Sequence, residues 1–262
     1  MSDLQKLLED GENQKALALV NEDEYAWEDL LGLLEGADED MQRSAFEIVS
    51  KAGDHPRLLE ALPMLILGLS SDEDDICRYA AEAMYYMGSD AAEASESLSS
   101  LLIHDDDEVR RAVARVFSQM GSSAIDGKDA LTDALSDSDE VVRGEAALAL
   151  GNLGNEVPEA VPRLINLLTD EEEFIHDGES IEVRNAAKTA LEQIGSDAVP
   201  GLLEAMRGDR PEQRAIAVNT LAGMDSLPEE AVKDIEEAVQ DPDESVQAAA
   251  RSAMKRIKAI KN

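Results

Sequence analysis

Residues 98–121 read LSSLLIHDDDEVRRAVARVFSQMG, and this stretch contains every part of the pattern that recurs along the chain. Leu98 and Leu102 are four residues apart, the spacing of one helix face, and Val109 follows Leu102 by seven residues. From Val109 to Met120 apolar residues alternate at three- and four-residue intervals and then stop at Gly121. The stretch therefore predicts two amphipathic helices joined by an acidic turn.

The same skeleton recurs seven times, in steps of 33 to 38 residues. A period of this length is typical of solenoids, in which each unit buries its apolar face only against its neighbours. We therefore predict an all-α solenoid and an extended recognition surface rather than a catalytic pocket. The first apolar position of the skeleton is occupied by Leu30, Leu65, Leu98, Leu131, Leu164, Leu202 and Ile235.

The ends of the helices are also marked in the sequence. Proline stands in the opening turn of several first helices, where its missing N–H would be unpaired in any case. Acidic residues precede the second helices, where they cap the N-terminus and complement the helix dipole. The second helices then end at a glycine, the usual left-handed stop. These glycines are Gly53, Gly88, Gly121, Gly154 and Gly195.

The composition narrows the classes of function. Hydrophobic residues make up 44% of the 262 residues and aromatic residues only 3%, so the core must consist of aliphatic side chains. No apolar run approaches the roughly 18 residues of a membrane span, and the N-terminal residues lack the pattern of a signal peptide. The single cysteine, Cys77, fits a reducing compartment. We expect a cytoplasmic protein without a membrane partner.

The charge is strongly acidic, with 58 acidic residues against 23 basic ones and a net charge of −35. Such a charge repels itself at low ionic strength and is largely screened in about 1 M salt. The composition resembles that of proteins from salt-adapted archaea. The alternative is an acidic protein built to bind a basic partner or to mimic nucleic acid. Direct binding of nucleic acid is not expected, because a phosphate backbone needs a basic stripe.

An acidic turn followed by apolar-Arg-x-x-Ala recurs at Val109-Arg110, Val142-Arg143 and Val183-Arg184. This pattern resembles the HEAT-repeat family, in its short bilin-lyase-type form. The resemblance implies a right-handed α-solenoid of about seven two-helix repeats, and the acidic composition suggests a halophilic archaeon as the source. It also implies a structural ladder in which the arginine bridges to the acidic turn of an adjacent repeat. The ladder arginines are Arg110, Arg143, Arg184 and Arg214, whereas Gln42, Cys77 and Gln247 occupy the same position in outer repeats.

Two regions depart from the repeat. Residues 1–24 do not fit it, and two short helical stretches, Asp3–Glu9 and Asn13–Val20, are predicted to form an N-terminal cap on a solenoid of residues 25–262. The fifth repeat has an insertion at about 169–180. Because insertions in repeat arrays are frequently functional, its apolar residues suggest either a partner contact or a local hydrophobic plug. The candidates are Phe174, Ile175 and His176.

No catalytic site emerges from the sequence. The three histidines, His55, His104 and His176, lie in different repeats, and Cys77 has no neighbouring histidine. The inserted loop is acidic, but it matches no template for a hard-cation loop. We therefore expect no enzyme activity, no metal site and no cofactor. The alternative is a bilin-lyase-type or other enzyme accessory subunit, which would act on a chromophore-bearing substrate.

The resemblance implies that the second helices line a concave face. Three arginines recur there, two places after the first core position of consecutive second helices, with aromatic residues nearby. Arginine and tyrosine dominate many protein interfaces. We therefore predict a scaffold or regulatory adaptor that binds another protein, as a monomer or as part of a hetero-complex. The candidate strip consists of Arg43, Phe46, Arg78, Tyr85, Tyr86, Arg111 and Arg115. The alternative is that its arginines pair only with the acidic turns.

Overall fold

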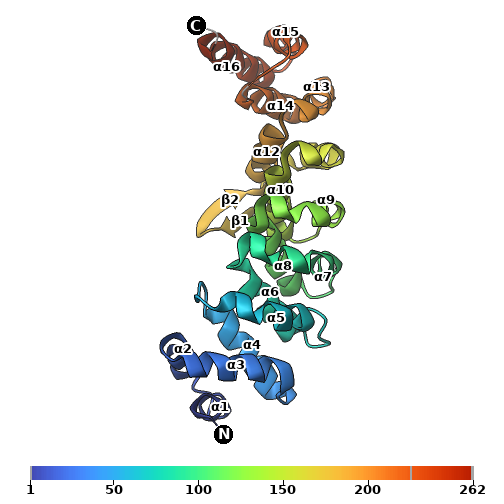
Figure 1. Ribbon diagram of the computed structural model, residues 1–262. Helices are drawn as coiled ribbons and strands as arrows, with labels where there is room; N and C mark the ends of the chain where they lie inside the picture. The colour runs from blue at the N-terminus through green and yellow to red at the C-terminus, as the bar shows by residue number, and fades with distance from the viewer. Residues whose placement is uncertain (1, 225, 261–262) are drawn as a thin grey trace. The chain divides into compact units, whose positions relative to one another are not determined.

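The computed structural model describes residues 2–224 and 226–260, which are mostly helical (Figure 1). The first half contains α1 (Asp3–Glu9), α2 (Asn13–Glu22), α3 (Glu24–Gly36), α4 (Glu39–Lys51), α5 (Leu62–Gly68), α6 (Asp74–Tyr85), α7 (Ser95–Leu101), α8 (Asp107–Met120) and α9 (Lys128–Ala134). The second half contains α10 (Glu140–Leu153), α11 (Val161–Leu167), β1 (Glu173–His176), β2 (Glu179–Glu182), α12 (Val183–Ile194), α13 (Val199–Met206), α14 (Pro211–Gly223), α15 (Glu229–Glu237) and α16 (Glu244–Ile260). The 3₁₀ segments are η1 (Leu58–Ala61), η2 (Gly88–Ala94), η3 (Gly121–Gly127), η4 (Gly154–Glu156), η5 (Pro158–Ala160), η6 (Gly195–Ala198) and η7 (Ala238–Gln240).

From α3 onward, the described helices follow one another as seven pairs, each with a first and a second helix. The chain divides into two compact units, Met1–Ala130 and Leu131–Asn262, and the division falls within α9. This division lies inside the predicted solenoid of residues 25–262, and the predicted boundary at residue 24 stays a prediction. The predicted all-α solenoid class is confirmed, because within each unit the second helices of successive pairs pack on one another, as α4 does on α6 and α10 on α12.

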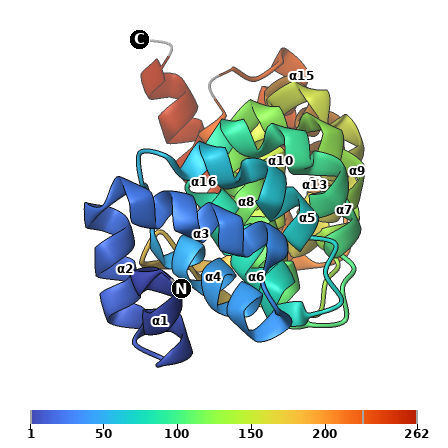
Figure 2. The same cartoon turned by 60° about the horizontal axis from the view of Figure 1, so that its bottom comes forward.

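The cap helices form at the predicted residues. In Figure 2, α1 and α2 lie against α3 and α4. Leu4 and Leu8 of α1, and Ala16 and Val20 of α2, are buried in this contact. Both helices therefore cover apolar surface that the first repeat would otherwise expose to water.

Helix α8 shows how the repeat sequence becomes structure. Asp106 caps the helix, and its Oδ1 accepts hydrogen bonds from the backbone N–H groups of Glu108 and Val109. The predicted apolar residues from Val109 to Met120 are all buried. The five glycines predicted to end second helices have φ between +52° and +72°, a left-handed conformation that costs other residues energy. Proline occupies the first turn of α5, α11 and α13, as predicted.

Each of the three phenylalanines of the chain packs against a glycine. Phe46 lies over Gly68, Phe117 over Gly127, and Phe174 over Gly144, so closely that a methyl group at any of these glycines would overlap the ring. The prediction that Phe46 belongs to the partner-binding strip is wrong, because its side chain does not point outward but is buried against Gly68 of α5. The missing side chain at Gly68 makes that space, and the helical pattern alone does not reveal it.

The insertion in the fifth repeat forms an antiparallel hairpin, β1–β2, with Phe174 opposite Ile181. The two residues between the strands, Asp177 and Gly178, both have positive φ, of 50° and 81°. Turns of this kind match the twist of paired strands, and Asp-Gly is a preferred sequence for them. The sequence therefore contains a hairpin signal that the prediction of a loop did not use.

Candidate partner-binding site

The predicted strip lies on the second helices of the first compact unit, α4, α6 and α8, which pack side by side. Arg43, Arg78 and Arg111 stand at equivalent positions near the start of these helices. The side chains are between 23% and 34% exposed. The structure therefore places the three arginines in one row, each partly accessible to a partner.

Each arginine of the row pairs with a carboxylate in the first turn of its own helix. Arg78 Nη2 lies 2.8 Å from Asp75 Oδ1, and Arg111 Nη1 lies 2.6 Å from Glu108 Oε1. Arg43 pairs with an acid of its own helix and reaches Glu73 of the next repeat, 3.2 Å away. The row is therefore oriented and locally neutralised, which agrees with the alternative that the arginines serve the acidic turns.

The aromatic part of the strip is only partly accessible. Tyr86 is 53% exposed, and its ring meets that of Tyr85 edge-on at a centroid distance of 5.2 Å. The Arg78 guanidinium lies 4.3 Å from the ring centroid of Tyr79, in cation–π contact. Arg115 is half-buried one turn after Arg111. Phe46 belongs to the core, so Tyr86 is the most exposed aromatic residue of the strip.

The inserted hairpin packs on α10 of the second unit (Figure 1). The Phe174 ring is buried over Gly144, while Ile175 on the opposite face of the strand is 53% exposed. His176 Nδ1 lies 3.0 Å from a carboxylate oxygen of the buried Glu145. Of the two interpretations of the insertion, a hydrophobic plug or a partner contact, Phe174 fits the plug. The exposed Ile175 side chain remains available for a partner.

Two arginines of the predicted ladder bridge to the next repeat. Arg143 Nε lies 2.9 Å from Asp170 Oδ2, and Arg143 also pairs with Glu172. Arg214 donates to both carboxylate oxygens of Asp241, at 2.9 and 2.8 Å. Arg184 pairs instead with Glu171 and Glu182 of its own repeat.

The residue at the ladder position also bonds a carbonyl of its own turn. Arg110 donates to the carbonyl of His104, and Arg143 to that of Asp137. The substitutes also contact nearby carbonyls. Gln42 donates to the carbonyl of Leu34, at the end of α3, at 2.8 Å, and the Cys77 thiol lies 3.2 Å from the carbonyl of Ser71 and 3.6 Å from that of Leu69. Burial raises the pKa of this thiol, which keeps Cys77 protonated and structural. Gln247 donates to the carbonyl of Asp241.

The Arg214–Asp241 pair predicts a dependence of stability on pH. The hydrogen bond from Arg214 holds the pKa of Asp241 below its usual range. Because the folded-state pKa is lower than the unfolded value of about 3.9, the pair stabilises the fold fully above about pH 5 and less as the pH falls through the folded pKa. We expect Asp241→Asn to lower the urea midpoint near neutral pH and to match wild type in strong acid.

The control for this prediction is Asp234→Asn, since Asp234 pairs with Arg207, whose side chain is far more exposed than that of Arg214. Exposed pairs contribute little and are screened by salt. In KCl the control should therefore change the midpoint less than Asp241→Asn does. A constant difference between Asp241→Asn and wild type down to strong acid would contradict the assignment.

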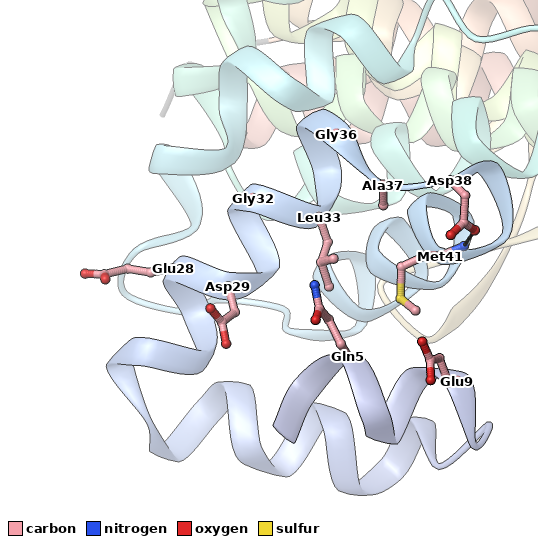
Figure 3. Close-up of a pocket in the computed structure, with 10 residues that line it drawn as sticks. All are labelled: Gln5, Glu9, Glu28, Asp29, Gly32, Leu33, Gly36, Ala37, Asp38 and Met41. Atoms are coloured by element: carbon pink, nitrogen blue, oxygen red, sulfur yellow. Dashed lines mark hydrogen bonds between the residues drawn. The ribbon is translucent and has the colours of Figure 1, made fainter. Parts of the chain in front are cut away.

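A pocket of about 550 Å³ lies between α1, α3 and the start of α4 (Figure 3). Gln5 and Glu9 of α1 face Leu33 and Met41 across it. Asp38 caps α4 by accepting from the Met41 N–H. The acidic lining disfavours an anionic ligand, and nothing at this pocket selects a particular cation. Its acidic residues are Glu9, Glu28, Asp29 and Asp38.

Residues 2–224 and 226–260 contain no group of three or more His, Cys, Asp or Glu side chains arranged to hold a metal ion. Among the same residues, no helix has both the length and the apolar character needed to cross a membrane.

Comparison with known proteins gives the following matches. A family model described as HEAT repeats matches residues 95–176 and 172–255, more than half of the chain. The archaeal HEAT-like repeats protein from Thermococcus onnurineus NA1 is 17% identical, with a TM-score of 0.58 over 100% of this chain and 99% of that one. A designed armadillo repeat protein in complex with the peptide (KR)4 is 18% identical, with a TM-score of 0.56 over 87% and 98%.

Yeast importin-beta (Kap95p) is 14% identical, with a TM-score of 0.68 over 94% of this chain and 38% of that one. This chain therefore corresponds to less than half of the importin length. No curated protein sequence matches the chain. At these identities the structural matches establish the repeat fold alone.

Proposed function

Because the chain belongs to the HEAT-repeat family, we propose that it is a non-enzymatic scaffold that binds a protein partner across α4, α6 and α8. The observation that carries the proposal is the row of Arg43, Arg78 and Arg111, which repeats at one position on three neighbouring helices. A partner bound across the row would contact several repeats at once, which is how repeat surfaces are used.

The ion pairs of the row also suit a binding surface. The carboxylate beside each arginine holds the guanidinium in place, so a partner meets donors that have already lost much of their freedom. Arg78 is further held by its contact with the Tyr79 ring. Tyr86 adds an exposed aromatic surface of the kind that anchors protein interfaces.

The fold supports a polypeptide partner. The designed armadillo repeat protein of the comparison is described in complex with the peptide (KR)4, so a repeat protein of similar fold can bind a peptide. In this chain the row has both signs of charge, and we propose that the partner presents carboxylates to the arginines and an apolar side chain to Tyr86.

The test is partner capture by the variant Arg78→Gln/Tyr86→Ala/Arg111→Gln. We expect wild type to retain a specific protein from a lysate of the source organism and the folded variant to lose at least about nine-tenths of it, because interface arginines and tyrosines often cost more than 1 kcal/mol each when truncated. Affinity capture followed by mass spectrometry measures the retained protein. Circular dichroism establishes that the variant remains helical.

The control removes two cationic side chains and one tyrosine elsewhere, in Lys188→Gln/Lys233→Gln/Tyr25→Ala. Tyr25 is 69% exposed, and both lysines lie in the second unit. This control has the same net charge as the test variant, so a general electrostatic effect would weaken both equally. Equal capture by wild type and the test variant would reject the row as the partner-binding surface.

A further inference from the structure

The ladder has a gap at its N-terminal end. Where a bridge to the next repeat forms, an arginine meets an aspartate at a fixed turn position, two residues after the last apolar position of the next first helix: Arg143 meets Asp170, and Arg214 meets Asp241. Between the first and second repeats both members are changed together. The arginine is replaced by Gln42, and the aspartate by Ser71 at the same turn position.

Ser71 keeps one of the two functions of the aspartate. Its hydroxyl accepts from the backbone N–H of Glu73 at 3.1 Å, as Asp170 accepts from Glu172 and Asp241 from Asp243. The turn is therefore built in the same way in all three places. Arg43 still pairs with Glu73 across these two repeats, but from a neighbouring position of the helix. What is missing is the ion pair at the ladder position, and with it the volume of that arginine side chain.

A pocket of about 480 Å³ lies at this gap, and both Gln42 and Ser71 line it. Its other walls are mainly apolar and include Leu67, which is 72% exposed. Glu35 lies at the pocket as well, and among residues 2–224 and 226–260 its carboxylate has no ion-pair or hydrogen-bond partner. The remaining lining residues are Leu34, Phe46, Met64, Gly68 and Ile76.

We propose that this pocket binds an arginine side chain of a partner protein, which supplies from outside the guanidinium that the open bridge lacks. The proposal deepens the scaffold function and rests on it, because the arginine belongs to a bound protein. The aliphatic part of the side chain packs on Leu67 and Met64, as long cationic side chains do on apolar surface. The guanidinium reaches the Glu35 carboxylate and the free oxygen of Gln42.

The polar groups of the pocket select this occupant. The Gln42 amide nitrogen already donates to the carbonyl of Leu34, so its Oε1 is left as an acceptor. Ser71 Oγ and the Glu35 carboxylate are also acceptors, and a planar guanidinium with five N–H donors matches such a set better than an ammonium group does. A carboxylate ligand at this pocket would be repelled by the neighbouring Glu35 carboxylate.

The test closes the pocket with the protein's own ladder pair, in the variant Gln42→Arg/Ser71→Asp. The two substitutions leave the net charge unchanged, so non-specific attraction of cations stays the same. The probe is an acetylated, amidated Gly-Gly-Arg-Gly-Gly peptide in about 0.5 M KCl, where long-range attraction is screened. Binding is followed by NMR shifts of the Gly68 and Ser71 amides in wild type.

For the variant, binding is followed at Gly68 and by calorimetry. We expect wild type to show saturable shifts confined to the pocket, and the variant to bind at least about ten-fold more weakly, because its own guanidinium occupies the site. Glu35→Gln should weaken binding about three-fold or more through loss of the charged acceptor, while Glu96→Gln, an exposed acid on α7, should stay within about two-fold.

A peptide with norleucine in place of arginine should give no saturable shift. Equal binding of the norleucine peptide, shifts spread over the acidic surface, or an unchanged Kd in the folded double variant would overturn the proposal. If the double variant does not fold, Glu35→Gln against Glu96→Gln decides. A wild-type chain that captures its partner but does not bind the arginine peptide at the pocket would reject this site and leave the scaffold function intact.

Discussion

Replacing Phe174 by alanine should lower the free energy of unfolding of the second unit by about 3 kcal/mol, the usual cost of truncating a buried aromatic side chain. The Phe174 ring is buried over Gly144 and is the main apolar contact of the hairpin. Its loss would expose part of α10 to water and weaken the contact between His176 and Glu145. Urea unfolding in KCl, together with hydrogen exchange of the α10 amides, measures the effect.

The neighbouring residue provides the control, since Ile175 is on the same strand but 53% exposed. Ile175→Ala should cost less than about 0.5 kcal/mol, as for most surface changes. Gly144→Ala provides a second check: it should destabilise wild type through overlap with the ring, but stabilise the Phe174→Ala variant by up to about 1 kcal/mol through better helix propensity. If Phe174→Ala and Ile175→Ala lowered the free energy of unfolding equally, the Phe174 ring would not be what holds the hairpin on α10.

Arg143→Ala should be comparably damaging. The Arg143 side chain is 10% exposed and its partner Asp170 15% exposed. Removing the guanidinium leaves a nearly buried carboxylate and the carbonyl of Asp137 without their donor. Breaking a buried ion pair from one side costs about 3 kcal/mol or more, mostly because the remaining charge is uncompensated. Urea unfolding followed by circular dichroism measures this loss.

Arg184→Ala is the matched control, because Arg184 holds the equivalent position in the next repeat but is more exposed and pairs within its own repeat. We expect it to cost less than about 1 kcal/mol, and less still in about 1 M KCl, where exposed pairs are screened. The loss from Arg143→Ala should persist at that salt concentration. If about 1 M KCl abolished the loss of stability caused by Arg143→Ala, the Arg143–Asp170 pair would behave as an exposed ion pair instead.

The repeat architecture is predictable from sequence because each signal is local. Apolar spacing, the Asp106 cap and the proline and glycine positions all act within one helix or its ends, and the structure confirms them. The position of Phe46 is not local in this way. Its burial depends on Gly68, 22 residues later and on another helix, so a helical wheel places Phe46 outward while the packing turns it inward.

The hairpin and the ladder also combine a local sequence signal with contacts that depend on tertiary packing. The Asp177-Gly178 turn is a local signal and was available in the sequence, whereas the seat of the hairpin on Gly144 depends on tertiary packing. The arginine positions were predicted, but their partners required the structure, because Arg184 turns to its own repeat while Arg143 reaches the next. The binding roles of the strip, of Ile175 and of the gap at Gln42 stay predictions.

The bridging arginine and its aspartate lie in different repeats, and this limits how such a gene can grow by duplication. A second copy of the fourth repeat, inserted after the first, would place Arg143 opposite another Asp137 and reproduce an ion pair of the existing kind. A second copy of the sixth repeat would place Arg214 opposite Gly208 and leave a nearly buried cation unmatched. The repeats share the same apolar spacing, yet only some of them can be duplicated in tandem without losing the ion pair between neighbouring copies.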